Sequence, residues 1–503
     1  MHPIDLAVVG AYVAAMLGVG IVVSRRIHGF RDYFVAAGRL TAPLLVCTLV
    51  STYYGLDVLF GNSEVSYLEG VVGFFGYTRP YYIVILVAAL VVARKLQGHG
   101  FLSLPDVAAH YYGRGTRVVV AIASAFYSLP LISVMGIGIL LDVMAGVPFP
   151  VGVVVGAAVS VVYTLLGGLM ADALTDTLQF VLMCITLGIA AALTLRELGG
   201  MEGLQAVLPA TYFDPMGTYP AWVLVVFAGS ALSALIEPAF YQRIFAAVSY
   251  RAVLVALLIG IALWAAYDWV ATVLGMAAAA RGLEVEPRYA LLTVVVDVLP
   301  VGLTGLFVAG ALAAAMSTID SYLLIAGGNL AYDIYRPLFR PDMDDASTLR
   351  LTRWMIVVSA GACVVFALFF QSVVSAWIFM STVLVASALV PLLFALYAPW
   401  QPRPAAGLAS SLAGLGVAIA YYALVTVLGA DDPEWGTRIW TVDVGGLTLS
   451  LWQDYAMLFA LPASAIGYAV GHRAGRPAAT DAGRGVESGT VPAEARAPEE
   501  ETR

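Results

Sequence analysis

The chain has 503 residues, of which 61% are hydrophobic and 12% are charged, and its formal net charge is −8 at pH 7. An ordinary soluble domain has about a quarter of its residues charged, so this composition excludes that class. Apolar windows of about 20 residues, the length that a helix needs to cross a bilayer, recur along almost the whole chain. We therefore predict an all-α polytopic membrane protein.

The sequence predicts thirteen transmembrane helices. Their centres lie near residues 15, 52, 83, 129, 159, 184, 229, 264, 313, 360, 385, 416 and 460. With the N-terminus outside, twenty of the twenty-five basic residues lie in loops that face the cytoplasm and four in outward loops, as the positive-inside rule requires. We expect a protein of the cell (plasma or inner) membrane with its C-terminus in the cytoplasm.

The chain divides into a membrane part and a tail. Residues 1–472 form the predicted transmembrane transporter domain. Residues 473–503 are rich in Gly, Ala, Pro, Arg and Glu and have almost no large apolar side chains. Such a segment cannot bury enough apolar surface to fold, so we expect a disordered cytoplasmic tail.

Two of the predicted helices contain residues that break helices. The second has Gly55 and Gly61 on either side of Asp57, and the seventh has Gly229 followed by Glu237–Pro238. Either one alone is typical of an ordinary kink. Because the two helices start five helices apart, together they favour an inverted-repeat transporter, in which carbonyls freed at the breaks line a cavity or bind an ion.

Candidate substrate-binding residues come from the broken helices and their neighbours: Tyr53, Asp57, Tyr77, Arg79, Glu237 and Trp264. The planar guanidinium of Arg79 can hold a substrate carboxylate by two hydrogen bonds; alternatively, it pairs internally with Asp57 or Glu237. The aromatic rings can stack on a sugar or hold a quaternary ammonium by cation–π attraction, or they simply pack. Asp268 and Asp320 are equally consistent with helix-orienting hydrogen bonds and with substrate contact.

A hydroxyl-rich patch lies in the middle of the ninth predicted helix. Ala314, Ser317 and Thr318 are spaced i, i+3 and i+4, so they share one helix face. Hydroxyl and carbonyl oxygens without net charge suit Na⁺, because hard cations take oxygen ligands. The alternative is that the hydroxyls only bond back to the carbonyl four residues earlier.

Two other classes of protein are weaker fits. An enzyme is not expected, because all five histidines fall at termini or in loops and no predicted helix holds a cluster of metal ligands. A transporter-derived sensor is a further alternative. It would need an output domain, and a disordered tail of about thirty residues is not one.

Five short motifs follow one another along the predicted helices. They are Arg31–Arg39 (RDYFVAAGR), Tyr163–Leu169 (YTLLGGL) with Thr175–Asp176 and Gln179, Pro238 with Gln242–Arg243, Leu299–Leu303 (LPVGL) and Met316–Ser321 (MSTIDS). In this order, on thirteen predicted helices, they make the chain resemble the sodium/solute symporter family over nearly its whole length.

The resemblance implies a LeuT-like core of two inverted five-helix repeats, at about residues 42–197 and 219–398. It also implies a Na⁺ site between the second and ninth helices. Its ligands would be the carbonyls of Ser51, Tyr54 and Ala314 and the hydroxyls of Ser317 and Thr318. Asp176 would lie on the inner path of ion release; alternatively, it caps the start of the sixth helix.

We therefore expect a secondary active symporter that imports a small organic solute with Na⁺ by alternating access. A carboxylate or an amino-acid-like solute is favoured, and a sugar or a quaternary amine such as choline is the alternative. Na⁺ is the expected co-transported ion, and no organic cofactor is expected. The expected surroundings are the lipid bilayer, and no nucleic acid is expected as a partner.

Overall fold

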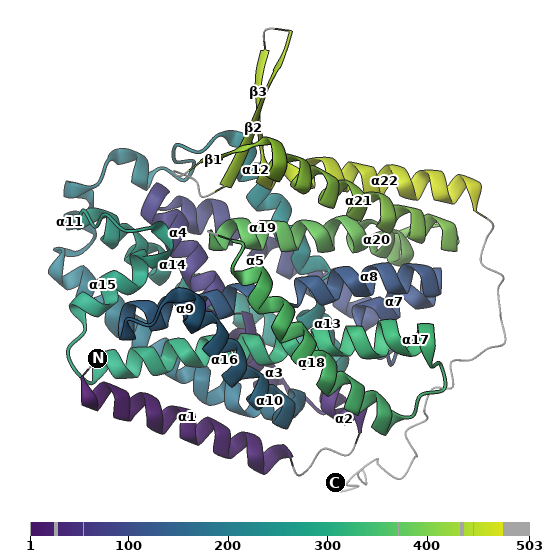
Figure 1. Ribbon diagram of the computed structural model, residues 1–503, viewed down its shortest axis with the longest axis horizontal. Coiled ribbons are helices and arrows are strands. Elements are labelled where there is room, and N and C mark those ends of the chain that lie inside the picture. Colours follow the sequence, from purple (N-terminus) through teal and green to yellow (C-terminus); the bar gives the residue numbers. More distant parts are fainter. Residues whose placement is uncertain are drawn as a thin grey trace, which may run out of the picture.

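The computed structural model describes residues 2–24, 29–53, 55–370, 372–432, 437–445 and 447–475. Within these ranges the protein is almost entirely helical, and most of the long helices run alongside one another (Figure 1). Large apolar side chains such as Ile83, Trp222 and Trp354 are exposed along the helices. A surface of this kind fits lipid rather than water.

The first half of the chain forms α1 to α11. Their bounds are α1 (Pro3–Ser24), α2 (Phe30–Val35), α3 (Ala42–Tyr53), α4 (Leu56–Glu69), α5 (Arg79–Val87), α6 (Ala93–Leu96), α7 (Leu104–Tyr112), α8 (Arg114–Tyr127), α9 (Leu131–Ala145), α10 (Phe149–Glu197) and α11 (Gly200–Val207). The π-helical segment η2 (Gly73–Thr78) precedes α5, and a second one, η3 (Ala88–Val92), joins α5 to α6, so that the four form one continuous span.

The second half forms α12 to α22 and a small sheet. The helices are α12 (Ala221–Ser230), α13 (Pro238–Ala246), α14 (Tyr250–Ala280), α15 (Ala290–Val298), α16 (Leu303–Gly328), α17 (Arg336–Phe339), α18 (Asp345–Ala367), α19 (Val373–Leu384), α20 (Val390–Tyr397), α21 (Pro404–Leu428) and α22 (Ala456–Ala474). The antiparallel strands β1 (Ala430–Asp432), β2 (Thr437–Val444) and β3 (Leu447–Trp452) lie in the order β1-β2-β3, with Trp440 opposite Leu451. The β2–β3 hairpin projects from the helical body (Figure 1).

Counting membrane spans from the lengths of the helices gives a smaller number than counting apolar windows in the sequence. Eight of the described helices are long and apolar enough to cross a membrane, and ten if each of two bent helix pairs is one span. Each predicted centre nevertheless falls within a helix or a continuous helical span of the described chain. The count of thirteen therefore stays a prediction.

One long helix accounts for two of the predicted spans. α10 has 49 residues, which at 1.5 Å per residue is more than twice the thickness of a bilayer core. Its backbone leaves helical geometry at Gly168, with φ 60° and ψ 178°. A Cβ on Gly168 would lie 2.6 Å from the Tyr33 ring, so both the positive φ and the close approach require glycine. This is the second glycine of the YTLLGGL motif.

Both helices that were predicted to be broken are interrupted in the structure. α3 and α4 are bent by 48° at a break of a few residues. In the seventh predicted helix, α12 runs into a 3₁₀ segment, η5 (Ala231–Leu235), and α13 then begins at Pro238. The Glu237 side chain accepts the Ala239 backbone N–H (3.4 Å) and so caps α13. Proline at the first helical position has no N–H to satisfy, which explains why the helix restarts there.

Cysteine labelling tests the predicted orientation. Gln205 on α11 is exposed, as are His99 before α7 and Asp342 after α17, and α11 lies at the opposite end of the bundle from α7 and α17 (Figure 1). In a background lacking the three native cysteines, we expect an impermeant thiol reagent to label Gln205→Cys on intact cells, and His99→Cys and Asp342→Cys only after permeabilisation. Labelling of Asp342→Cys on intact cells would mean an inverted protein.

Candidate functional site

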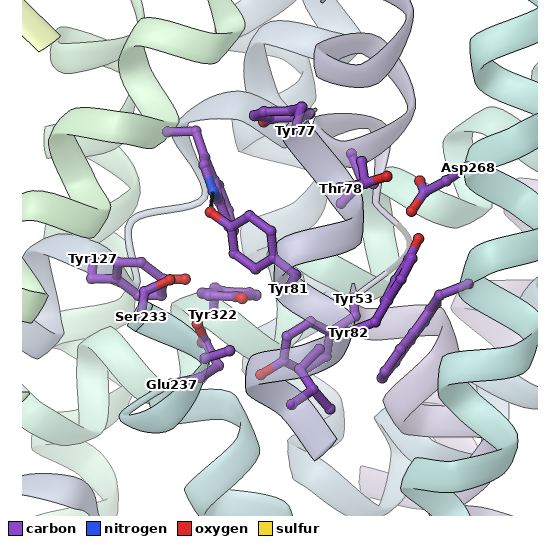
Figure 2. A pocket seen from close by; sticks show the side chains of 15 residues that line it. Tyr53, Tyr77, Thr78, Tyr81, Tyr82, Tyr127, Ser233, Glu237, Asp268 and Tyr322 are labelled. Atoms are coloured by element: carbon purple, nitrogen blue, oxygen red, sulfur yellow. Dashed lines mark hydrogen bonds between the residues drawn. The ribbon is translucent and has the colours of Figure 1, made fainter. Parts of the chain in front are cut away.

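A cavity lies where the two broken helices meet α5, α14 and α16 (Figure 2). Measured to the centre of a water-sized sphere, its volume is about 60 Å³, which is room for about four water molecules. The side chains that line it are Tyr53, Val58, Tyr77, Thr78, Tyr81, Tyr82, Ile85, Tyr127, Ser233, Ala234, Glu237, Trp264, Asp268, Tyr322 and Trp377. A site of this size fits a small solute.

Four of the six predicted substrate residues line this one cavity. Tyr53 enters from the end of α3, Tyr77 from η2, Glu237 from the break before α13 and Trp264 from α14. The rings of Tyr53 and Trp264 lie 5.4 Å apart between centroids. The side chain of Asp57, the fifth candidate, lies outside the described part of the chain.

The sixth candidate, Arg79, does not line the cavity. Its side chain is exposed, and its guanidinium lies 5.5 Å from the centroid of the Phe75 ring. Ile83 and Leu86, at i+4 and i+7 from Arg79 and so on the same face of the helix, are also exposed. This position contradicts a carboxylate clamp inside the pocket. The alternative, an internal pair of Arg79 with Asp57 or Glu237, stays a prediction.

Much of the cavity wall consists of aromatic residues that the sequence did not single out. Tyr81 follows Tyr77 at i+4, and this spacing was the sequence signal that could have placed Tyr81 on the same helix face as Tyr77. Tyr127, Tyr322 and Trp377 come from three other helices. Tyr127 lies 6.3 Å from Tyr322 and 5.9 Å from Trp377 between ring centroids, and the Trp377 indole N–H donates to the Tyr81 hydroxyl. These four residues form a continuous wall.

The predicted Na⁺ site lies beside this cavity, between α3 and α16. The Thr318 hydroxyl is 3.0 Å from the Thr52 carbonyl oxygen and 3.1 Å from the Ala314 carbonyl oxygen. The Thr318 hydroxyl thus bonds back to its own helix, which was the alternative to a Na⁺ ligand, and it also approaches α3; its role as a Na⁺ ligand stays a prediction. Three uncharged oxygens meet there, a set that suits a hard cation.

The other predicted Na⁺ ligands, Ser317, Ser51 and Tyr54, do not all lie at this point of contact between α3 and α16. Ser317 turns toward α10, and its hydroxyl donates to the Asp176 carboxylate. Ser51 is fully buried in α3, but the carbonyl that reaches Thr318 is that of the next residue, Thr52. Tyr54 lies outside the described residues.

Asp176 does not cap a helix. It lies inside α10, well beyond the interruption at Gly168, and its side chain is fully buried. Because its carboxylate accepts a hydrogen bond from Ser317, it touches the predicted ion site directly. The alternative of a cap at the start of the sixth helix is therefore wrong.

A buried arginine organises the polar contacts around this site. Arg243 of α13 is 1% exposed. Its guanidinium donates to the hydroxyls of Thr48 and Thr52 on α3 and of Ser321 on α16, and it lies 3.4 Å from Asp172 of α10. One side chain thus links four helices. In the sequence Arg243 was noted only as the last residue of a motif. Its role could not be predicted there, because its partners lie on other helices.

A third carboxylate belongs to the same buried layer. Asp320 of α16 accepts a hydrogen bond from the Thr164 hydroxyl of α10 (2.8 Å). One oxygen each of Asp172, Asp176 and Asp320 has no hydrogen-bond partner among the described residues. The motifs around Thr164, Asp176, Arg243 and Ser317 therefore converge in space.

Comparison with proteins of known sequence identifies the family of this chain. The profile of the sodium:solute symporter family matches residues 33–414. The chain is 25% identical to the sodium/pantothenate symporter of Escherichia coli over 451 residues, which are 83% of this chain and 90% of that protein. It is also 25% identical to the human high affinity choline transporter 1 over 371 residues, which are 68% of this chain and 63% of that transporter, so this match spans less than two thirds of its length.

Two solved structures share the fold. One is a Na⁺-coupled sialic acid symporter in a substrate-bound, outward-open state, with a TM-score of 0.74 and 16% identity over 95% of this chain and 99% of that one. The other is Mhp1, a nucleobase-cation-symport-1 family transporter, with a TM-score of 0.53 and 12% identity over 89% of this chain and 95% of that one. At these identities the likeness shows the fold alone, which is that of LeuT-like transporters. Because the family profile covers most of the sequence, the chain belongs to the sodium:solute symporter family.

Proposed function

We propose that this protein imports a small organic solute together with Na⁺ by alternating access, from the outside of a cell membrane to the cytoplasm. The observation that carries the proposal is the contact of the Thr318 hydroxyl of α16 with the Thr52 carbonyl near the end of α3, just before the break. The neighbouring residue, Tyr53, lines the cavity. A cation held between α3 and α16 would therefore order the same backbone that forms a wall of the solute site.

The proposed Na⁺ ligands are those of the prediction, with Thr52 added to Ser51 as a carbonyl donor from α3. Asp176, which contacts Ser317, would lie on the path by which the ion leaves toward the cytoplasm. Two inverted repeats, at about residues 42–197 and 219–398, would rock against each other around this fixed site. The relatives named for Na⁺-coupled transport of pantothenate and proline support this reaction class.

The driving force is sufficient for accumulation. One Na⁺ crossing a potential of 100 mV yields about 2.3 kcal/mol, and a tenfold concentration gradient adds about 1.4 kcal/mol. Their sum of about 3.7 kcal/mol supports a solute ratio of roughly 400 to one, because each 1.4 kcal/mol is a factor of ten. As predicted from the sequence, a carboxylate or an amino-acid-like solute is favoured, in keeping with the relatives named for pantothenate and proline, and a sugar or a quaternary amine such as choline is the alternative.

Selective binding of Na⁺ is the first expected result. In the purified protein, Tm should rise with Na⁺ concentration and not with K⁺ at equal ionic strength. At ten times Kd the stabilisation is about 1.4 kcal/mol. Proteoliposomes should then accumulate a bound solute only with an inward Na⁺ gradient. Equal Tm values in Na⁺ and K⁺, with uptake that ignores the gradient, would refute Na⁺ coupling.

A further inference from the structure

We propose that a groove on the outside of the bundle, between α20 and α22, binds one anionic phospholipid of the cytoplasmic leaflet. An acyl chain would lie in the groove and the phosphate headgroup at its mouth. The proposal goes beyond Na⁺ symport and does not depend on it. The lining of the groove, the rings at its mouth and the basic residues around that mouth support it.

The first support is the groove itself. It is lined by the end of the π-helical segment η8 (Val385–Leu389), by α20 and the loop that follows it, and by the middle of α22. Measured in the same way as the solute cavity, its volume is about 650 Å³, against about 60 Å³ for that cavity. All eleven described lining residues are Leu, Val, Ala, Pro, Phe, Tyr or Trp. Such a wall suits a hydrocarbon chain and offers a hydrophilic solute few hydrogen bonds.

One wall of the groove is held in place by close packing of α22 on α21. Gly467 and Gly471 of α22 face the backbone of α21, and a Cβ on Gly467 would lie 2.6 Å from the Ala409 carbonyl oxygen. Small residues of this kind let two membrane helices approach closely. The groove side of α22 carries the larger Leu461 and Pro462. The helix is therefore fixed from behind by α21, and its other side is left to line the groove.

The second support is a pair of aromatic rings at one end of the groove. Tyr397 and Trp400 line it and are 42% and 43% exposed. Tyr397 is the last residue of α20, and Trp400 lies in the loop before α21. Tyr and Trp gather at the level of the lipid headgroups, because one end of the ring is apolar and the other can bond to water. We therefore place this end of the groove at the membrane surface.

The third support is the positive charge beside these rings. The Lys95 ammonium lies 3.9 Å from the centroid of the Tyr397 ring and donates to a backbone carbonyl of α20. On the other side, the Arg403 guanidinium donates to the His472 carbonyl at the end of α22. The His472 ring lies 5.7 Å from the Trp400 ring between centroids. Two cations thus flank the mouth of the groove.

No carboxylate balances this charge within the described part of the chain. The three stretches that form the groove and its mouth contain no Asp or Glu; they are residues 82–105, 373–430 and 455–480. Two further arginines of these stretches, Arg94 and Arg473, are exposed. Among the described residues no ion pair includes either of them, or Lys95 or Arg403. An anionic group at the mouth would supply the missing negative charge.

The position of the mouth favours a lipid of the cytoplasmic leaflet. α22 ends at the same end of the bundle as α7 and α17 (Figure 1), which is the predicted cytoplasmic end. That leaflet carries the anionic lipids, and basic pockets between helices on that side suit their headgroups. A phosphate also accepts strong hydrogen bonds from ammonium and guanidinium groups. Apolar groove, aromatic rings and cations thus follow one another in the order of chain, interface and headgroup of a phospholipid.

Lipids that differ in one property test the proposal. The full-length protein, washed free of native lipid in detergent, is given phosphatidylglycerol, phosphatidylcholine with the same acyl chains, or glycerol phosphate without chains. Each cation near a membrane surface strengthens the binding of an anionic lipid about fivefold. By thermal shift and native mass spectrometry we therefore expect one phosphatidylglycerol per protein, bound at least tenfold more tightly than phosphatidylcholine, and no binding of glycerol phosphate. Equal affinities for the two phospholipids, or for phosphatidylglycerol and glycerol phosphate, would overturn the proposal.

Charge variants locate the headgroup. In Lys95→Gln and in Arg403→Gln we expect Kd for phosphatidylglycerol to rise about fivefold, because each removes one of the two flanking cations. Kd for phosphatidylcholine should stay the same. Arg340→Gln is the control, because Arg340 is exposed after α17 at the same end of the protein. If Arg403→Gln does not fold, Lys95→Gln decides.

A groove-filling variant locates the acyl chain. Ala465 lines the groove and is exposed, so Ala465→Phe places a ring in the groove without disturbing the core. It should weaken the binding of both phospholipids at least fivefold, whereas Ala423→Phe, at an exposed position of α21 outside the lining, should not. Unchanged Kd values in all three groove variants would refute the site. A protein dimer that holds no lipid and that Ala465→Phe dissociates would show a second copy in the groove and would also refute it.

The Na⁺ response separates this proposal from the proposed function. If phosphatidylglycerol binds as expected but neither Tm nor uptake responds to Na⁺, Na⁺ symport fails and the lipid site stands. If Na⁺ raises Tm and drives uptake while the two phospholipids bind equally, the reverse holds.

Discussion

Replacement of Thr318 by alanine should raise the half-saturating Na⁺ concentration by about tenfold to a hundredfold while the protein stays folded. The variant removes a hydroxyl that lies 3.0 Å from the Thr52 carbonyl and 3.1 Å from the Ala314 carbonyl. A contact to a charged partner is worth about 1.5–3 kcal/mol, and each 1.4 kcal/mol is a factor of ten. Ser317→Ala should act in the same direction, because Ser317 joins the site to Asp176.

Thr382→Ala is the matched control for this experiment. Thr382 of α19 is also buried and also bonds back to the carbonyl four residues earlier, that of Ile378 (2.8 Å). Loss of that bond alone should leave the Na⁺ dependence of Tm and of uptake unchanged. Half-saturating Na⁺ that is the same in Thr318→Ala, Ser317→Ala and Thr382→Ala would remove the Na⁺ site from this position.

The second large effect is expected at Arg243. Arg243→Gln leaves the Asp172 carboxylate buried without its cationic partner and removes hydrogen bonds to α3 and α16. Breaking a buried pair by removing one partner costs about 3–5 kcal/mol. The purified variant should therefore have a clearly lower Tm and a weaker response to Na⁺, because Arg243 also donates to the Thr52 hydroxyl.

A double mutant distinguishes the lost pair from lost packing. Adding Asp172→Asn to Arg243→Gln removes the uncompensated charge, so the double mutant should recover a large part of the Tm that the single mutant loses. Arg39→Gln is the control, because its ion pair with Asp32 lies at an exposed surface and such pairs contribute about 1 kcal/mol or less. If Arg243→Gln were no more destabilising than Arg39→Gln, the buried cluster would not hold these helices together.

The sequence was sufficient for the features that depend on local chemistry. A bilayer requires long apolar helices, so composition alone identified the class of protein. Helix-breaking residues change the backbone at their own position, and the interruptions near Gly55 and before Pro238 are present in the structure. Spacing along one helix was equally informative, because Ala314 and Thr318 at i and i+4 do meet.

What faces the interior of the bundle was decided only by the tertiary structure. In a soluble helix a polar stripe marks the outer face, but lipid and protein core are both apolar, so this signal is absent from a membrane helix. Arg79 and Tyr81 stand two residues apart on one helix, yet Arg79 is exposed and Tyr81 lines the cavity. Which side chains line the cavity could not be predicted for this reason.

The meeting of distant residues is the other part that only the fold determines. Asp172, Arg243 and Ser321 lie on three helices far apart in sequence, and their contact depends on how α10, α13 and α16 pack. The carbonyl that the Thr318 hydroxyl reaches is that of Thr52, next to the predicted Ser51, and this too depends on how α3 and α16 pack. Spacing predicts the face of one helix, whereas a binding site requires the faces of several helices at once.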